Sequence, residues 1–210
     1  GIPYIFGDLG STDKDVVPDT NMKNAGVHIV VDTAVEIDRK NKIVKLKKGE
    51  DCQYKKLIIA TGSSPIIPTF IPGYDLENVF AIIKDKKYLD DVLKKMETLK
   101  DLVVIGGGFI GVEFSEQLRK SGKNVTIVEM TDTCVGTAFD KEFTEVLETS
   151  LKENGIGLRT GTKVTRIVGS EKVTGVEIEG GEVIPADMVI MSIGVKPNSN
   201  QSKINRIPRK

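Results

Sequence analysis

The chain has 210 residues, which suits one large or two modest domains, and its 30 lysine and arginine residues balance 30 aspartate and glutamate residues. It lacks the basic excess that a nucleic-acid phosphate backbone attracts, so we expect no nucleic-acid partner. Because it has no apolar run of about 18 residues, and only two cysteines without close spacing, we expect no membrane span, no metal site and a reducing, cytoplasmic location.

Two parts of the chain resemble each other at a constant separation in sequence. Gly49-Glu50 corresponds to Gly181-Glu182, and at the same separation the apolar run before Gly62 corresponds to the run before Gly194. In each copy the pattern predicts a short strand, an alternating strand, a hairpin turn at Gly-Glu and an apolar strand. Two β-rich segments can also match by chance, but the constant separation favours a true internal repeat.

Each copy contains an apolar strand, and in the first copy a stiff linker follows it. The runs Leu57–Ala60 and, in the second copy, Met188–Met191 predict strands covered on both faces, as in parallel sheets. Pro65, Pro68 and Pro72 come next, and each fixes its own φ and biases the preceding residue away from helix. These prolines indicate a domain boundary near residues 66–80.

Beyond the linker, helical and strand patterns alternate. Helical spacing predicts helices at 84–100, 109–121 and 140–153, and runs of apolar and β-branched residues predict strands at 102–105, 124–129 and 156–159. The last helix has its apolar positions at Phe143, Val146, Leu147 and Leu151. This alternation predicts an α/β fold, Rossmann-like, with a parallel, right-handed, doubly wound sheet and a three-stranded β-meander.

The turn between the first of these strands and its helix is rich in glycine. Gly106, Gly108 and Gly111 satisfy the spacing G-x-G-x-x-G. The first glycine permits a tight turn, the second the close approach of a pyrophosphate, and the third the packing of helix on strand. The phosphates then face the positive end of the helix dipole. A turn that binds nothing is the alternative, whereas a P-loop is excluded because no Gly-Lys-Ser/Thr closes the turn.

Glu129 ends the next predicted strand. In dinucleotide-binding folds, a carboxylate that binds the ribose follows the glycine-rich turn at a characteristic distance along the chain, and Glu129 lies close to that position. This carboxylate accepts hydrogen bonds from ribose hydroxyl groups and repels a 2′-phosphate. No arginine or lysine within residues 130–133 offsets that repulsion. The sequence therefore favours NADH over NADPH, the alternative being a solvated glutamate at a strand end.

The repeat also predicts what lies outside the printed sequence. If the second copy contains strand, glycine-rich turn, helix and meander, we expect the corresponding first half of copy one before Gly1. Two nucleotide-binding modules imply two cofactors, and hydride transfer between a nicotinamide and a flavin is the common reason to have both.

These motifs resemble the FAD-dependent pyridine nucleotide-disulfide oxidoreductases, particularly the branch of NADH oxidase, NADH peroxidase and CoA-disulfide reductase. The resemblance covers about residues 1–198, and the chain looks truncated at both ends. Three segments carry it: Leu57–Pro65 is similar to the flavin-side "ATG" motif, Gly106–Glu113 to the NADH motif, and Ile193–Asn198 to a second ATG-like segment.

The resemblance implies roles for individual residues. Ala60, Thr61 and Gly62 would lie along FAD, and Val35 would reach its adenine end through the backbone. For NADH, the resemblance implies that Phe109 is an aromatic residue covering the flavin face, that Ile110 lines the nucleotide site and that Glu113 is a carboxylate near the nicotinamide. The role of Gly194 follows from the predicted sheet instead: it ends a strand of the same sheet as Gly106, so it can border the same crevice and let the cofactor approach closely. An ordinary helix glutamate is the alternative for Glu113, and a simple chain turn for Gly194.

Two features depart from the family pattern. Residues 1–4 resemble those that directly follow the redox cysteine, so the nucleophilic cysteine is expected before Gly1, and Cys52 and Cys134 are expected to be unreactive surface or core thiols. The pattern ends after Asn198, where residues 199–210 form a linker-like tail. His28, in an apolar segment predicted as a strand, is expected to be structural.

The sequence thus predicts three parts: residues 1–79 of an FAD-binding domain, an NAD(H)-binding domain at 80–194, and a return to the FAD domain or a tail at 195–210. The predicted function is an NADH-dependent flavoprotein oxidoreductase that passes hydride from NADH to FAD and on to oxygen, peroxide or a disulfide. Its substrate would be a small molecule and the full-length protein a homodimer. The alternative is a non-catalytic NADH-binding module or redox sensor.

Overall fold

The computed structural model describes residues 2–199, which separate into two compact units. Residues 2–16 and 65–195 form the first unit, and residues 17–64 and 196–199 form the second. These boundaries differ from the predicted one at residue 79, because residues 65–79 and 2–16 pack with the glycine-rich part of the chain. Which cofactor each part binds stays a prediction.

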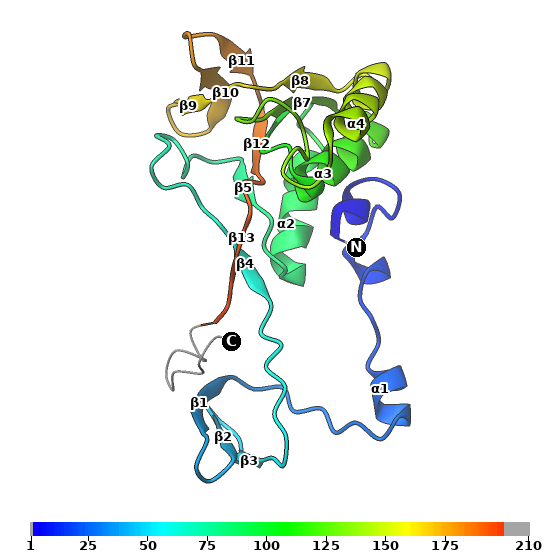
Figure 1. The fold of residues 1–210 in the computed structure, drawn as a ribbon, viewed down its shortest axis with the longest axis vertical. Helices are drawn as coiled ribbons and strands as arrows, with labels where there is room; N and C mark the ends of the chain where they lie inside the picture. Colours follow the sequence, from blue (N-terminus) through cyan, green and yellow to red (C-terminus); the bar gives the residue numbers. More distant parts are fainter. Residues whose placement is uncertain (1, 200–210) are drawn as a thin grey trace. The chain divides into compact units, whose positions relative to one another are not determined.

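A five-stranded parallel sheet forms the centre of the first unit (Figure 1). Its strands are ordered β5 (Val79–Ala81), β12 (Met188–Met191), β6 (Asp101–Ile105), β7 (Asn124–Val128) and β8 (Gly157–Arg159). All neighbouring pairs are parallel, with Met191 opposite Ile105 and Ile105 opposite Val128. The predicted strands at 102–105, 124–129 and 156–159 are confirmed, as is the continuous burial of Met188–Met191.

Three helices connect these strands: α2 (Lys86–Met96), α3 (Phe109–Lys120) and α4 (Lys141–Glu153). The first begins at Lys86 instead of the predicted residue 84, because the Asp85 side chain accepts from the backbone N–H of Tyr88 and caps the helix, and it ends at Met96 instead of residue 100. In α4 the apolar pattern was only partly right. Leu151 is buried, but Phe143 is 67% exposed and Thr144 occupies a buried position instead.

The two faces of the parallel sheet have different cores. Side chains of Leu102, Val104 and Ile127 pack with residues of α2, α3 and α4. Those of Val103 and Ile105 point to the other face, where they pack with the meander of strands β9 (Val164–Gly169), β10 (Val173–Ile178) and β11 (Val183–Pro185). The predicted α/β, Rossmann-like fold with a parallel sheet and a three-stranded β-meander is confirmed. Only the expectation of double winding differs, because the helices pack on one face of the sheet and the meander covers the other (Figure 1).

The N-terminal segment packs on α3. A 3₁₀ turn over Ile2–Phe6 buries Ile5 and Phe6, and the rings of Phe6 and Phe114 lie 4.9 Å apart between centroids. A second 3₁₀ turn follows at Thr12–Lys14. This packing explains why the first residues belong to the same compact unit as the glycine-rich turn.

The second unit contains a meander of its own, in strands β1 (Ala34–Asp38), β2 (Ile43–Leu46) and β3 (Cys52–Gln53). Both meanders are antiparallel and pair in sequence order. When Gly49 is aligned with Gly181, the first meander overlaps the second strand for strand. The internal repeat is therefore confirmed for these elements.

Other predicted strands of the second unit do not form. Residues 57–60 and 27–31 have no strand structure, and Ile58 and Val31 are 88% and 94% exposed. Among residues 2–199 no strand pairs with either segment, so their apolar side chains have no second layer to cover them. His28 is accordingly exposed in an irregular segment, not in a strand.

The remaining elements are a short helix α1 (Thr20–Asn24) and strands β4 (Ser63–Pro65) and β13 (Val195–Pro197), which pair in a two-stranded sheet. Across residues 2–199 no helix is both long enough and apolar enough to cross a membrane. The same residues contain no group of three or more His, Cys, Asp or Glu side chains that could hold a metal ion.

Candidate dinucleotide-binding site

The glycine-rich turn joins β6 to α3, and two of its glycines are required by close packing. Gly106 has a φ of 108°, and a Cβ atom there would collide with the carbonyl oxygen of Ser192, at the end of β12. A Cβ on Gly111 would collide with the carbonyl oxygen of Gly106. Both glycines therefore let the helix start close against the sheet.

Gly108 differs from these two because it faces open space. It is the N-cap of α3, with extended backbone angles and no side chain capping the helix. A Cβ built on it would meet nothing within 4 Å. The first N–H groups of α3 are thus accessible at the positive end of its dipole, which is the arrangement that binds phosphate. The residues present fit a pyrophosphate at this position.

Glu129 follows β7 and lies against the same turn. Its Oε2 accepts from the backbone N–H of Gly107 at 2.6 Å, and its Oε1 accepts from the N–H and the hydroxyl of Thr131 at 2.7 and 2.8 Å. The side chain is half-buried. The predicted spacing thus corresponds to direct contact between carboxylate and turn, although the binding of ribose by Glu129 stays a prediction.

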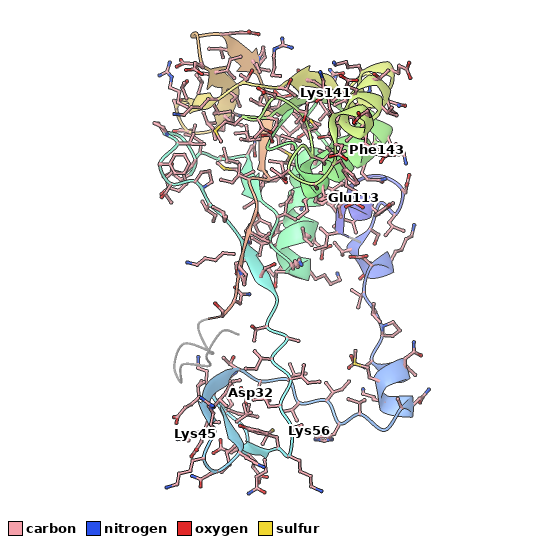
Figure 2. The ribbon with its side chains drawn as sticks, in the orientation of Figure 1. Asp32, Lys45, Lys56, Glu113, Lys141 and Phe143 are labelled. Atoms are coloured by element: carbon pink, nitrogen blue, oxygen red, sulfur yellow. The ribbon has the colours of Figure 1, made fainter. Side chains whose placement is uncertain are left out.

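The start of α3 presents apolar side chains to solvent. Phe109 is 58% exposed, and its ring meets that of Phe139 edge to face at 5.7 Å, while Phe139 in turn lies 6.3 Å from Phe143 on α4. Ile110 is also exposed, and Glu113 is half-buried on α3 (Figure 2). The aromatic row was missed in the sequence because Phe139 lies in a loop and Phe143 was assigned to a buried helix face.

Gly194 lies at the same edge of the sheet as Gly106. The strands β12 and β6 are parallel neighbours, so their carboxyl ends meet at that edge. Gly194 has a φ of 112°, which only glycine adopts readily, and its carbonyl accepts from the N–H of Ile66 at 3.0 Å. This places Gly194 in a position to border a ligand bound at the strand ends.

In the second unit, Thr61 and Gly62 are held by Asn198. The Thr61 hydroxyl donates to the Asn198 carbonyl at 2.6 Å, the Asn198 side-chain amide donates to the Thr61 carbonyl at 3.0 Å, and the Asn198 N–H donates to the Gly62 carbonyl at 2.9 Å. The two ATG-like segments are thereby joined. Ala60 is exposed in the irregular chain just before them, and Val35 is an exposed residue of β1.

The surroundings of Cys134 are those of an inert thiol. Cys134 is fully buried, with its sulfur beneath Gly107, and burial together with the carboxylates of Glu148 and Glu129 raises the pKa of its thiol to about 12. Thiolate is the nucleophilic form, so this thiol is inert near neutral pH. Cys52 is half-buried in β3.

Known proteins resemble this chain over most of its length. The family model described as pyridine nucleotide-disulphide oxidoreductase matches residues 7–209. An "NADH oxidase" of Enterococcus faecalis is 39% identical over 181 residues, which cover 83% of this chain and 40% of that protein. An "NAD(P)H sulfur oxidoreductase (CoA-dependent)" of Pyrococcus abyssi is 34% identical over 204 residues, covering 94% and 45% respectively.

Solved structures of similar proteins share the fold of this chain. The "NAD-Dependent Persulfide Reductase from A. fulgidus" superimposes with a TM-score of 0.84 at 30% identity, covering 97% of this chain and 40% of that one. The reduced CoADR-RHD of Bacillus anthracis gives a TM-score of 0.85 at 29% identity, covering 97% and 38%. The chain spans less than half the length of each of these proteins. It belongs to the pyridine nucleotide-disulphide oxidoreductase family.

Proposed function

We propose that this chain is part of an NADH-dependent flavoprotein oxidoreductase that passes a hydride from NADH to FAD and then to oxygen, peroxide or a disulfide. One observation carries the proposal: the carboxylate of Glu129 is hydrogen-bonded to the glycine-rich turn beside the uncapped N-terminus of α3. A phosphate-binding helix end and a ribose-binding carboxylate in contact are the two groups that a dinucleotide needs.

The first unit would bind NADH, within the predicted range 80–194. The N–H groups at the start of α3 would receive the pyrophosphate beside Gly108, and Glu129 would accept hydrogen bonds from the adenine-side ribose. Phe109, Ile110 and Glu113 lie at the start of α3, and Gly194 borders the same sheet edge, so these residues would surround the nicotinamide half.

The second unit would contribute to an FAD site; it contains the middle of the range 1–79 that was predicted to belong to an FAD-binding domain. Its support is the hydrogen-bonded junction of Thr61, Gly62 and Asn198, which fixes the backbone of two ATG-like segments. Ala60 and Val35 would extend this surface. Bound FAD supplies the two-electron chemistry that links NADH to the final acceptor.

Names of relatives favour an enzyme over a non-catalytic module. They include "NADH oxidase" and "NAD(P)H coenzyme A polysulfide/persulfide reductase", and no observation on this chain favours a sensor. For the whole protein we propose a small-molecule substrate, a homodimer and a cytoplasmic location. We propose no nucleic-acid partner, since the 30 basic and 30 acidic residues balance.

Titration of the purified chain tests the proposal. Saturable binding of NADH, with weaker binding of NADPH, is expected by calorimetry, and addition of FAD followed by gel filtration is expected to leave a yellow protein with a visible flavin spectrum. Binding of NADH without uptake of flavin would support the non-catalytic module instead. Absence of any NADH binding would overturn the proposed site.

A further inference from the structure

The hydroxyl group of Thr131 lies between two acceptors. Its Oγ1 is 2.8 Å from Oε1 of Glu129 and 3.1 Å from the carbonyl oxygen of Thr133. A hydroxyl group carries one proton and donates one full hydrogen bond at a time. The Thr131 hydroxyl can therefore turn from the carboxylate to the carbonyl without movement of the backbone.

The backbone around Thr131 is fixed by neighbouring strands and loops. The N–H of Gly161 donates to the Thr131 carbonyl at 2.8 Å, and the N–H of Thr162 donates to the Glu129 carbonyl at 2.9 Å. These two bonds fix the backbone at Glu129 and Thr131, and the N–H groups of Gly107 and Thr131 orient the carboxylate itself. Rotation of the hydroxyl is then the simplest change open to this pair.

Rotation of the Thr131 hydroxyl changes how many hydrogen bonds the Glu129 carboxylate can accept from a ligand. An ionised carboxylate has roughly four lone-pair positions. On Oε1 two are used, by the N–H and the hydroxyl of Thr131, and on Oε2 one is used, by the N–H of Gly107. One position is left, whereas the 2′- and 3′-hydroxyl groups of a ribose together offer two donors.

We propose that Thr131 is a specificity-determining, positioning residue: its hydroxyl must turn from Glu129 to the Thr133 carbonyl before the carboxylate can accept both hydroxyl groups of a ribose. This inference rests on the proposed function, since it assumes that the ligand of Glu129 is a ribose. It adds that recognition of the second hydroxyl costs the bond between Thr131 and Glu129. Loss of the second hydroxyl from the ligand therefore weakens binding by less than the strength of its own hydrogen bond to Glu129.

The test compares ligands that differ by one hydroxyl group. ADP-ribose and 2′-deoxy-ADP-ribose, deoxygenated on the adenosine ribose, are titrated against the wild-type chain, against Thr131→Val and against Thr131→Ser. Within each variant, the Kd for 2′-deoxy-ADP-ribose divided by the Kd for ADP-ribose measures how much the 2′-hydroxyl contributes to binding. General effects of a substitution on the loop cancel in that ratio.

Thr131→Val has nearly the same shape but no hydroxyl, so a position on Oε1 is free from the start. We expect the Kd ratio to rise by about 3- to 10-fold in Thr131→Val, the worth of one hydrogen bond, and to stay at the wild-type value in Thr131→Ser. Thr162→Val is the matched control: its hydroxyl donates to the Thr160 carbonyl at 2.8 Å and its side chain does not bond Glu129. Its ratio is expected to equal the wild-type ratio.

The outcomes separate this inference from the proposed function. A wild-type chain that binds neither NADH nor ADP-ribose would overturn both. A wild-type chain that binds both ligands, with an unchanged or lower Kd ratio in Thr131→Val, would overturn the role of Thr131 alone. The same rise in Thr162→Val would also overturn it, because the effect would then not depend on the hydroxyl beside Glu129.

Discussion

The backbone N–H of Gly107 donates to Oε2 of Glu129 at 2.6 Å. This bond joins the turn after β6 to the end of β7, so the proposed phosphate-binding and ribose-binding groups are held together by the protein itself. An acceptor that holds a buried glycine in place also has a structural role. Substitutions at the site must therefore be tested for stability as well as for binding.

Replacing the carboxylate of Glu129 by a cation is expected to reverse nucleotide preference. In Glu129→Arg the repulsion of a 2′-phosphate becomes attraction, and the acceptor for ribose hydroxyl groups is lost. We expect the ratio of the Kd for NADPH to the Kd for NADH to fall by about 10-fold or more, measured by calorimetry. Glu142→Arg, on the exposed side of α4, makes the same change of charge elsewhere, and its ratio should stay unchanged. An unaltered ratio in Glu129→Arg would show that Glu129 does not contact the ribose.

Gly106 is expected to be sensitive to the addition of a side chain. Gly106→Ala forces a side chain into a φ of 108° and against the Ser192 carbonyl, and we expect it to lower the free energy of unfolding by about 3 kcal/mol. Gly180→Ala is the control, because Gly180 also has a positive φ, 92°, but open space around it. Urea denaturation measures both. Equal losses would show that the contact with Ser192 costs nothing.

Gly108→Ala is expected to separate binding from stability. The backbone of Gly108 has a φ of −71°, which alanine adopts, and a Cβ there meets no atom within 4 Å. The free energy of unfolding should therefore change by less than about 1 kcal/mol. The new methyl group would stand where the pyrophosphate approaches, so the Kd for NADH should rise by about 10-fold or more. Unchanged NADH affinity would mean that phosphate binds elsewhere.

Local patterns predicted the glycine-rich turn and its flanking elements well. The apolar run of β6, the glycine spacing and the helical stripe of α3 follow one another directly in the chain, and each reports on its own conformation. Distant pairing was not readable in this way. The run 57–60 has the composition of a buried strand, yet a strand needs a neighbour, and none pairs with it among residues 2–199.

Long-range packing explains the other differences. The contact between Phe6 and Phe114 joins residues far apart in the chain, and no periodicity in either segment announces it. Likewise the stripe through Phe143 and Val146 has helical spacing, but the sheet is covered from a neighbouring side of α4, where Thr144 is buried. Helical spacing identified the helix, and only tertiary contacts decided which of its sides was covered.

The two cysteines are expected to differ sharply in reactivity. Burial, with the carboxylates of Glu148 and Glu129, raises the pKa of Cys134 to about 12, so almost none of it is thiolate at pH 8. Cys52 is only half-buried. With iodoacetamide under native conditions, mass spectrometry should show alkylation of Cys52 and protection of Cys134, and urea should remove the protection. Equal rates in the folded chain would contradict the buried position of Cys134.

The same thiol makes stability depend on alkaline pH. Its pKa is higher in the folded chain, about 12, than its ordinary value of 9.0, so above pH 9 the unfolded chain releases a proton that the folded chain retains. This contribution to stability is complete below pH 9 and is lost progressively as the pH rises toward 12. Lysines also titrate in that window, so the measurement is the difference in free energy of unfolding between the wild-type chain and Cys134→Ala. That difference should shrink from pH 8 to pH 10.5. A difference independent of pH would show that the thiol ionises as readily in the folded chain as in the unfolded one.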